Sequence, residues 1–385
     1  MVSFTARSVL TPAAIVRIAV GWGAVLGLLF AGPLLEPPVP AWLLITALLL
    51  IVGVILVCAF GVVHEAEHLA QRLGDPYGSL VLTLSIVLIE VVLISAVMLG
   101  PGEHTTIARD SVMAVSMIIL NAVIGLSLLV GGIRHGALRH NRTGTSVYLA
   151  LLVVLSALAF ALPAVIGSNG SYTPAQEIPI IVLTLALYGF FLVRQMGKQA
   201  GDFREDPGLA AGQHARAGGR PASEHQSVRA VIAEHRPEVL LRMAVLVVTV
   251  LPIVLLSHDM ATLLDDGLER VGAPVALSGI LIAMIVFLPE SITSVRAALQ
   301  GEIQRVINLC HGALVSTVGL TIPAVLVIGL LTGQAVVLAE SPINLLLLGV
   351  TLLLSVTTFA GKKVTATHGA AHLVVFAVYG IAVFS

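Results

Sequence analysis

Apolar stretches of membrane-spanning length recur along the whole chain, with short polar segments between them. Runs of about 20 apolar residues match the length that a helix needs to cross the hydrocarbon core of a bilayer, and they lack the alternation of every second residue that a barrel strand shows. We therefore expect an all-α polytopic membrane protein. The pattern predicts about eleven transmembrane helices, at residues 12–32, 41–63, 77–100, 108–133, 146–166, 176–196, 239–257, 274–299, 305–330, 342–359 and 368–385.

Composition agrees with this prediction and excludes other classes. The 385 residues are 57% hydrophobic and 11% charged, with a mean hydropathy of +1.03, which no soluble domain of this size requires. The net charge of −1 gives no reason to expect a nucleic-acid partner. Both cysteines, Cys58 and Cys310, fall inside predicted spans, so a disulfide framework is not expected.

The distribution of basic residues predicts the orientation. Lysine and arginine concentrate in the loop 134–145, the connector 197–237 and the short loop that holds Lys362 and Lys363. These three segments share one side of the membrane if the N-terminus is inside, and the opposite loops hold few basic residues and several acidic ones. We expect the N-terminus to lie inside and the C-terminus outside.

Two glutamates, Glu90 and Glu290, stand in the middle of otherwise apolar spans. A charge at the bilayer centre costs about 2.5–3.5 kcal/mol on insertion scales, so such residues are expected to be functional. Their flanks are similar, with Gly78-Ser79 before the first and Ser278-Gly279 before the second. They lie on the third and eighth predicted spans, so two such copies enter the membrane from opposite sides.

Because the third and eighth predicted spans cross the membrane in opposite directions, the sequence predicts two inverted five-helix repeats and one extra helix. The expected divisions are an N-terminal helix (1–40), a first repeat (41–196), a cytoplasmic connector (197–237) and a second repeat (238–385). Inverted repeats place a binding site near the midplane, between helices that are locally broken. Pro289, beside Glu290, is a residue that breaks a helix in this way.

The residue types predict a site that holds either a cation or protons. Two carboxylates neutralise Ca²⁺, which takes six to eight oxygen ligands. Without a cation, two carboxylates in a low-dielectric site cannot both stay ionised. We expect Glu90 and Glu290 to bind the metal ion, and the further oxygen ligands to come from Asn121, Ser316, Ser291, Ser294 and Ser95.

A second hypothesis comes from the segment His64-Glu65-Ala66-Glu67-His68, which satisfies the zinc-protease pattern H-E-x-x-H. Asp266 would have to complete that site, but it follows the seventh predicted span on the outer side, whereas the histidines end the second span on the inner side. Two other interpretations of the segment stay open. It is either an amphipathic helix on the inner surface or a cytoplasmic vestibule, formed by His64, Glu65, Glu67 and His68, that gathers cations or senses pH.

Both repeats resemble those of the calcium/cation antiporter superfamily, in particular its bacterial calcium/proton and sodium-potassium/proton branch. The similarity lies in Phe287-Leu288-Pro289-Glu290-Ser291, in Gly312 through Pro323, and in Gly74 through Ser79 followed by Ile89-Glu90. The usual Gly-Asn-Ala before the acid is missing in both copies, so fewer oxygen ligands are available for calcium. The resemblance implies a secondary active antiporter that exchanges Ca²⁺, or else Na⁺ or K⁺, for protons without a cofactor. It also implies a location in the inner membrane of a bacterium, and it gives no oligomeric state.

Overall fold

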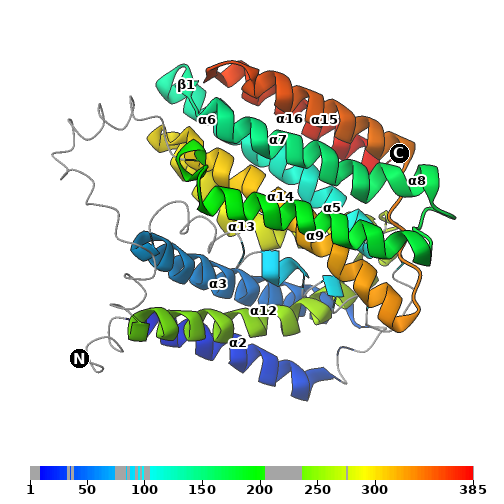
Figure 1. The fold of residues 1–385 in the computed structure, drawn as a ribbon. Coiled ribbons are helices and arrows are strands. Elements are labelled where there is room, and N and C mark those ends of the chain that lie inside the picture. The colour runs from blue at the N-terminus through cyan, green and yellow to red at the C-terminus, as the bar shows by residue number, and fades with distance from the viewer. Residues whose placement is uncertain are drawn as a thin grey trace.

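The computed structural model describes residues 9–32, 35, 39–73, 105–203, 236–274 and 276–384, together with single positions and short pieces between 84 and 98. Nearly all of this is helix (Figure 1). The first part of the chain forms α2 (Pro12–Ala31), α3 (Ala41–Leu73), α5 (Ile107–Met117), the π-helical turn η2 (Ile118–Val123), α6 (Ile124–His135), α7 (Arg142–Ser156), the π-helical turn η3 (Ala157–Ala161), α8 (Leu162–Ile166) and α9 (Pro174–Met196), and it ends in the short 3₁₀ turn η4 (Ala200–Phe203).

The second part begins beyond the connector. It consists of α12 (Arg236–Arg270), α13 (Ala276–Gln300), α14 (Ile303–Thr332), α15 (Pro342–Ala360) and α16 (Ala366–Val383). One small sheet joins the two parts, because β1 (Leu138–Arg139) pairs antiparallel with β2 (Lys363–Val364).

The described residues contain nine helices long and apolar enough to cross a membrane, or ten when the bent α13 is counted as one span. The prediction of a multi-pass helical membrane protein is therefore confirmed. The predicted span 77–100 falls mostly outside the described residues, as do the segment 74–79 and most of the connector.

Two predicted helix ends are wrong. The second span does not end at residue 63, because α3 continues without a break to Leu73 and includes His64 and His68. The seventh does not end at residue 257, because α12 continues to Arg270. The acidic residues that we expected in a loop, Asp259, Asp265, Asp266 and Glu269, are therefore helical. The sequence pattern predicts that these spans end where charged side chains begin. Ion pairs such as Arg270–Asp266 instead keep these turns helical.

The helices form two groups around a buried centre. In Figure 1, α2, α3 and α12 lie together at the bottom, α6, α7, α15 and α16 at the top, and α13 and α14 between them. Burial follows this arrangement. Within the 18 most apolar consecutive residues of each span, 83% are buried in the segment from α5 to α6 and 67% in α14, but only 11% in α2. The segment from α5 to α6 and α14 are thus the best shielded from lipid.

The loops gather at two opposite ends of the bundle. At one end, the β1–β2 pair joins the loop after α6 to the loop after α15. At the other, the backbone N–H of Val337 donates to Thr105, 2.9 Å away, and those of Leu338 and Ala339 donate to the carbonyl of Gly170. The described N-terminal helix starts at the β1–β2 end, and α16 finishes at the other end (Figure 1).

Glycines allow α6 and α16 to approach closely. A Cβ on Gly369 would lie 2.5 Å from the carbonyl oxygen of Gly125, and one on Gly132 would overlap the backbone nitrogen of Ala366. Small residues at such crossings let two backbones pack directly, which is the main attraction available between helices in lipid.

We expect Gly369→Ala to lower the free energy of unfolding by about 1–3 kcal/mol, because an added methyl overpacks a contact between two backbones. Gly380→Ala, on the same helix, is the matched control, since a Cβ there meets nothing within 4 Å. Unfolding of both purified variants in detergent would measure the difference. Equal stabilities would contradict the close-packing account.

Candidate cation site

Glu290 lies on α13, just after a bend in that helix. The segments Leu277–Ile285 and Phe287–Gln300 meet at 56°. Pro289 explains the position of the bend, because a proline ring clashes with the carbonyl four residues earlier, here that of Ile285, and removes the hydrogen bond to it. The broken helix that the sequence predicts beside Glu290 is therefore present.

Glu90 is held by α14. The hydroxyl of Thr317 donates to Glu90 Oε2 over 2.5 Å, and both residues are buried. Sequence analysis selected Ser316 and missed Thr317. The two positions are adjacent, but one step along a helix turns a side chain by about 100°, so only one of them faces the glutamate.

Three carboxyl oxygens at this centre lack a hydrogen bond. Among the described residues, Glu90 Oε1 and both oxygens of Glu290 have no partner. The side chains are buried, with 4% and 5% of each residue exposed, and their charges are close enough to interact. Unpaired buried carboxyl oxygens are rare in folded proteins, and a water, an ion or a proton usually satisfies them. The two glutamates that the sequence selected thus share one polar centre.

Asn121 lies in η2, in the middle of a buried helix. Its side-chain nitrogen donates to Thr351 Oγ1 on α15 over 2.8 Å, and its oxygen is 3.3 Å from Nδ1 of His372 on α16. Such π-helical turns inside α-helices are frequent at functional sites. The amide thus bonds side chains on two neighbouring helices, α15 and α16, and it makes no hydrogen bond to either glutamate.

The predicted serines have other partners in the structure. Ser316 accepts from the hydroxyl of Tyr188 on α9 at 2.9 Å, and Ser294 Oγ is 3.5 Å from Cys310 Sγ. Ser95 and Ser291 donate to the carbonyls of Val91 and Phe287 one turn back on their own helices. Of these four, Ser294 lies one turn after Glu290 and shares its helix face.

The segment His64–His68 is arranged for ion pairing. Glu65 is buried and pairs with Arg242 on α12 at 2.7 Å, and Glu67 lies 3.8 Å from Arg305 on α14. Nor is Asp266 near the histidines: its neighbour Gly267 packs against Leu44, which is twenty residues or about 30 Å of helix from His64. Among the described residues, no group of three or more His, Cys, Asp or Glu side chains forms a metal site.

Sequence and structure comparisons identify the family. The model of the sodium/calcium exchanger protein family matches residues 41–197 and 241–385. The chain belongs to this family. It is 34% identical over 338 residues to the putative ionic transporter y4hA of Sinorhizobium fredii, covering 87% of this chain and 88% of that protein. It is 31% identical over 341 residues to the sodium-potassium/proton antiporter ChaA of Escherichia coli, covering 88% of each.

A solved H⁺/Ca²⁺ exchanger, CAX, has the same fold, with a TM-score of 0.68 and 14% identity over 96% of this chain and 89% of that one. The family membership establishes the chain as a secondary active cation antiporter in a membrane, and not an enzyme. The zinc-protease hypothesis is therefore wrong, and the ion pairs of Glu65 and Glu67 give the physical reason.

Thr317→Val should weaken apparent cation affinity about tenfold, because a hydrogen bond to a charged group contributes about 1.5–3 kcal/mol. The hydroxyl stabilises the charged carboxylate that a cation requires. Thr317→Ser keeps the donor and should keep the affinity. Thr321→Val, one turn along α14, is the control, because the buried Thr321 hydroxyl has no partner among the described residues. The half-saturating cation concentration in vesicles is the measurement, and an unchanged value for Thr317→Val would contradict the assignment.

Proposed function

We propose that this antiporter exchanges Ca²⁺, Na⁺ or K⁺ for protons, and that Glu90 and Glu290 carry the cation and the protons in turn. The observation behind the proposal is the pair of buried glutamates with three carboxyl oxygens that have no hydrogen-bond partner among the described residues. Oxygens in that state are free to bind a cation or to take up a proton.

The site would hold either the cation or protons, but not both at once, and this would couple cation transport to proton transport. A cation attracts both carboxylates and favours their ionised forms. When it leaves, two neighbouring negative charges in a buried site repel each other, and protonation relieves the repulsion. Ser294, on the face of Glu290, and Thr317 are proposed as neutral oxygen ligands. Asn121, Ser316, Ser95 and Ser291 are proposed to support the helices around the site.

Reciprocal contacts support the proposed inverted repeats, 41–196 and 238–385. Ser316, in the second repeat, bonds Tyr188 on the last helix of the first repeat. Asn121, in the first repeat, bonds His372 on the last helix of the second. A two-fold relation between the repeats predicts this exchange. The family match also falls into two segments that leave out the proposed N-terminal helix 1–40 and connector 197–237.

The similar proteins differ in what they indicate about the transported cation. The protein at 31% identity is named a sodium-potassium/proton antiporter, and it covers 88% of this chain. The H⁺/Ca²⁺ exchanger is only 14% identical, so it supports the fold and not the substrate. We therefore keep Na⁺ and K⁺ beside Ca²⁺ as proposed substrates.

The proposed location is the inner membrane of a bacterium, with the N-terminus inside. Two of the three basic segments meet where β1 pairs with β2, and the loops that hold Thr105, Gly170 and Val337 bond one another at the other end of the bundle. This grouping is consistent with one basic inner face and one outer face poor in basic residues.

Purified protein in liposomes that enclose a pH-sensitive dye provides the test. With an acid interior, external Ca²⁺, Na⁺ and K⁺ are added in separate experiments. The proposal expects at least one of them to raise the internal pH, with isotopic uptake of the same ion, and that ion is the substrate. Cation uptake that continues without proton movement would contradict proton exchange.

A further inference from the structure

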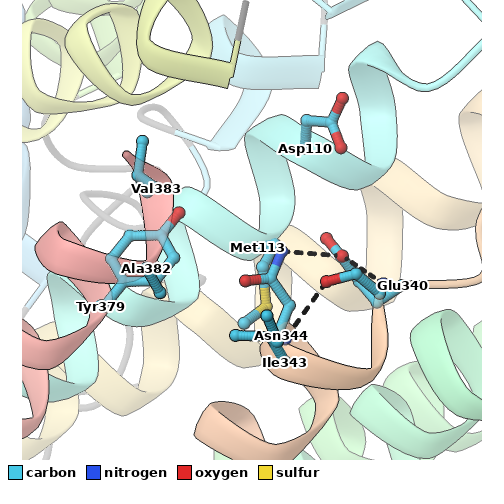
Figure 2. Close-up of a pocket in the computed structure, with 9 residues that line it drawn as sticks. Asp110, Met113, Glu340, Ile343, Asn344, Tyr379, Ala382 and Val383 are labelled. Atoms are coloured by element: carbon cyan, nitrogen blue, oxygen red, sulfur yellow. Dashed lines mark hydrogen bonds between the residues drawn. The ribbon is translucent and has the colours of Figure 1, made fainter. Parts of the chain in front are cut away.

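A small polar cavity of about 160 Å³ lies beside the last turn of α16, and its lining residues do not include Glu90 or Glu290 (Figure 2). Its walls come from α5, the start of α15 with the two residues before it, and the end of α16. Four of the lining side chains are polar or charged and matter here: Asp110, Glu340, Asn344 and Tyr379. The space accommodates several water molecules, or one cation with part of its hydration shell.

Glu340 is buried at this cavity with one oxygen unpaired. Its side chain is 1% exposed. Oε2 accepts from the backbone N–H of Ser341 and from the side chain of Asn344, both at 2.9 Å. Oε1 has no hydrogen-bond partner among the described residues. Burial raises the pKa of this carboxyl, although Asn344, Ser341 and Arg109 oppose the rise.

The charge around Glu340 is not balanced. Arg109 Nε lies 3.9 Å from Glu340 Oε1, beyond hydrogen-bonding distance, and 2.8 Å from Asp110. The same guanidinium also donates to the backbone carbonyl of Ala339 at 2.9 Å. The guanidinium thus donates to Asp110 and to the Ala339 carbonyl, and Glu340 Oε1 receives no hydrogen bond from it. Tyr379 lines the same cavity as the two carboxylates (Figure 2).

We propose that this cavity is a second cation site, which binds a divalent metal ion such as Ca²⁺ through Glu340 Oε1 and Asp110. The Asn344 amide and the Tyr379 hydroxyl supply neutral oxygens, as a hard cation prefers. The two carboxylates favour a divalent ion over a monovalent one. The site is separate from Glu90 and Glu290, and it does not depend on the exchange reaction proposed for them.

Terbium luminescence tests the proposal, because Tb³⁺ binds at oxygen sites that accept Ca²⁺ and emits when a neighbouring tyrosine is excited. The parent protein is the full chain with Glu90→Gln and Glu290→Gln, which removes the central carboxylates from the signal. We expect saturable emission that Ca²⁺ displaces and that millimolar Na⁺ does not. Tyr379→Phe should reduce the emission.

Glu340→Gln should weaken Tb³⁺ binding about tenfold or more, since the charge of the ligands sets the affinity of such sites. Asp110→Asn, at a partly exposed position, is a second variant that should also weaken binding. Asp266→Asn removes an acidic residue from α12 near the same end of the bundle and should leave binding unchanged.

Unaltered Tb³⁺ affinity in both Glu340→Gln and Asp110→Asn would overturn the proposal, as would displacement by Na⁺ as effective as that by Ca²⁺. The readout is binding, so the result stands whether or not the proposed exchange is correct.

Discussion

Glu290→Gln and Glu90→Gln are each expected to reduce cation-coupled proton movement to the level of liposomes without protein. Glutamine keeps the size of the side chain but neither ionises nor carries an exchangeable carboxyl proton. Each variant would leave one carboxylate, which can neither balance a divalent ion nor provide the mutual repulsion that favours proton uptake when the cation leaves. The measurement is the rate of internal pH change in liposomes after addition of the substrate ion.

Glu302→Gln is the matched control for these two variants. Glu302 is an acidic residue beside α14, but its side chain is 32% exposed and pairs with Arg305 at 3.3 Å. It should transport at the wild-type rate. If both central variants also exchange at the wild-type rate, the assignment of the carrier carboxylates is wrong.

Arg242→Ala is expected to lower the free energy of unfolding by about 3–5 kcal/mol, because removal of one partner leaves a buried charge without compensation. Arg242 is 2.7 Å from Glu65, and the two side chains are 8% and 5% exposed. This pair joins α12 to α3. Denaturant unfolding of the purified protein would measure the loss.

Two further variants make that prediction specific. Arg270→Ala, at the other end of α12, removes a more exposed pair with Asp266 and should cost less than about 1 kcal/mol. Glu65→Gln added to Arg242→Ala should recover part of the lost stability, because the most deeply buried carboxylate that Arg242 contacts is then neutral. Equal losses in the free energy of unfolding for Arg242→Ala and Arg270→Ala would show that the buried Glu65–Arg242 pair contributes no more to stability than an exposed pair.

The general fold was predictable because each membrane helix must satisfy its own backbone within one apolar segment. Helix ends were predicted less well. Hydropathy placed the end of the second span before His64, but Glu65 is neutralised by Arg242, which is 177 residues away. A pair so distant in sequence leaves no local signal. A helix over this segment was one of the open interpretations, but its unbroken continuation of α3 could not be foreseen.

The site was predictable in its acids and not in its partners. Glu90 and Glu290 are conspicuous because charge inside a membrane segment is costly. Thr317 differs from the predicted Ser316 by one position, and spacing alone does not tell which of two adjacent hydroxyls faces the glutamate. The partners of Asn121, Thr351 and His372, lie 230 and 251 residues away. Only the packing of α15 and α16 against η2 brings them together.

The register between the repeats also explains a difference between the two acids. When Asn121 is aligned with Ser316, the counterpart of Thr317 is Ala122, which has no hydroxyl. Glu90 accordingly has a donor, and both oxygens of Glu290 have none among the described residues. On this account Glu290 is the carboxyl that depends more on a cation or a proton for its stability.

Proton release on cation binding tests the central claim most directly. Purified protein in weakly buffered detergent solution, with a pH indicator, is titrated with the substrate ion, and bound cation is counted in parallel. The account predicts that binding to the wild type releases protons, and that the protein with Glu90→Gln and Glu290→Gln neither binds the ion at this centre nor releases protons. Cation binding to the wild type without proton release, or equal release from the double variant, would contradict it.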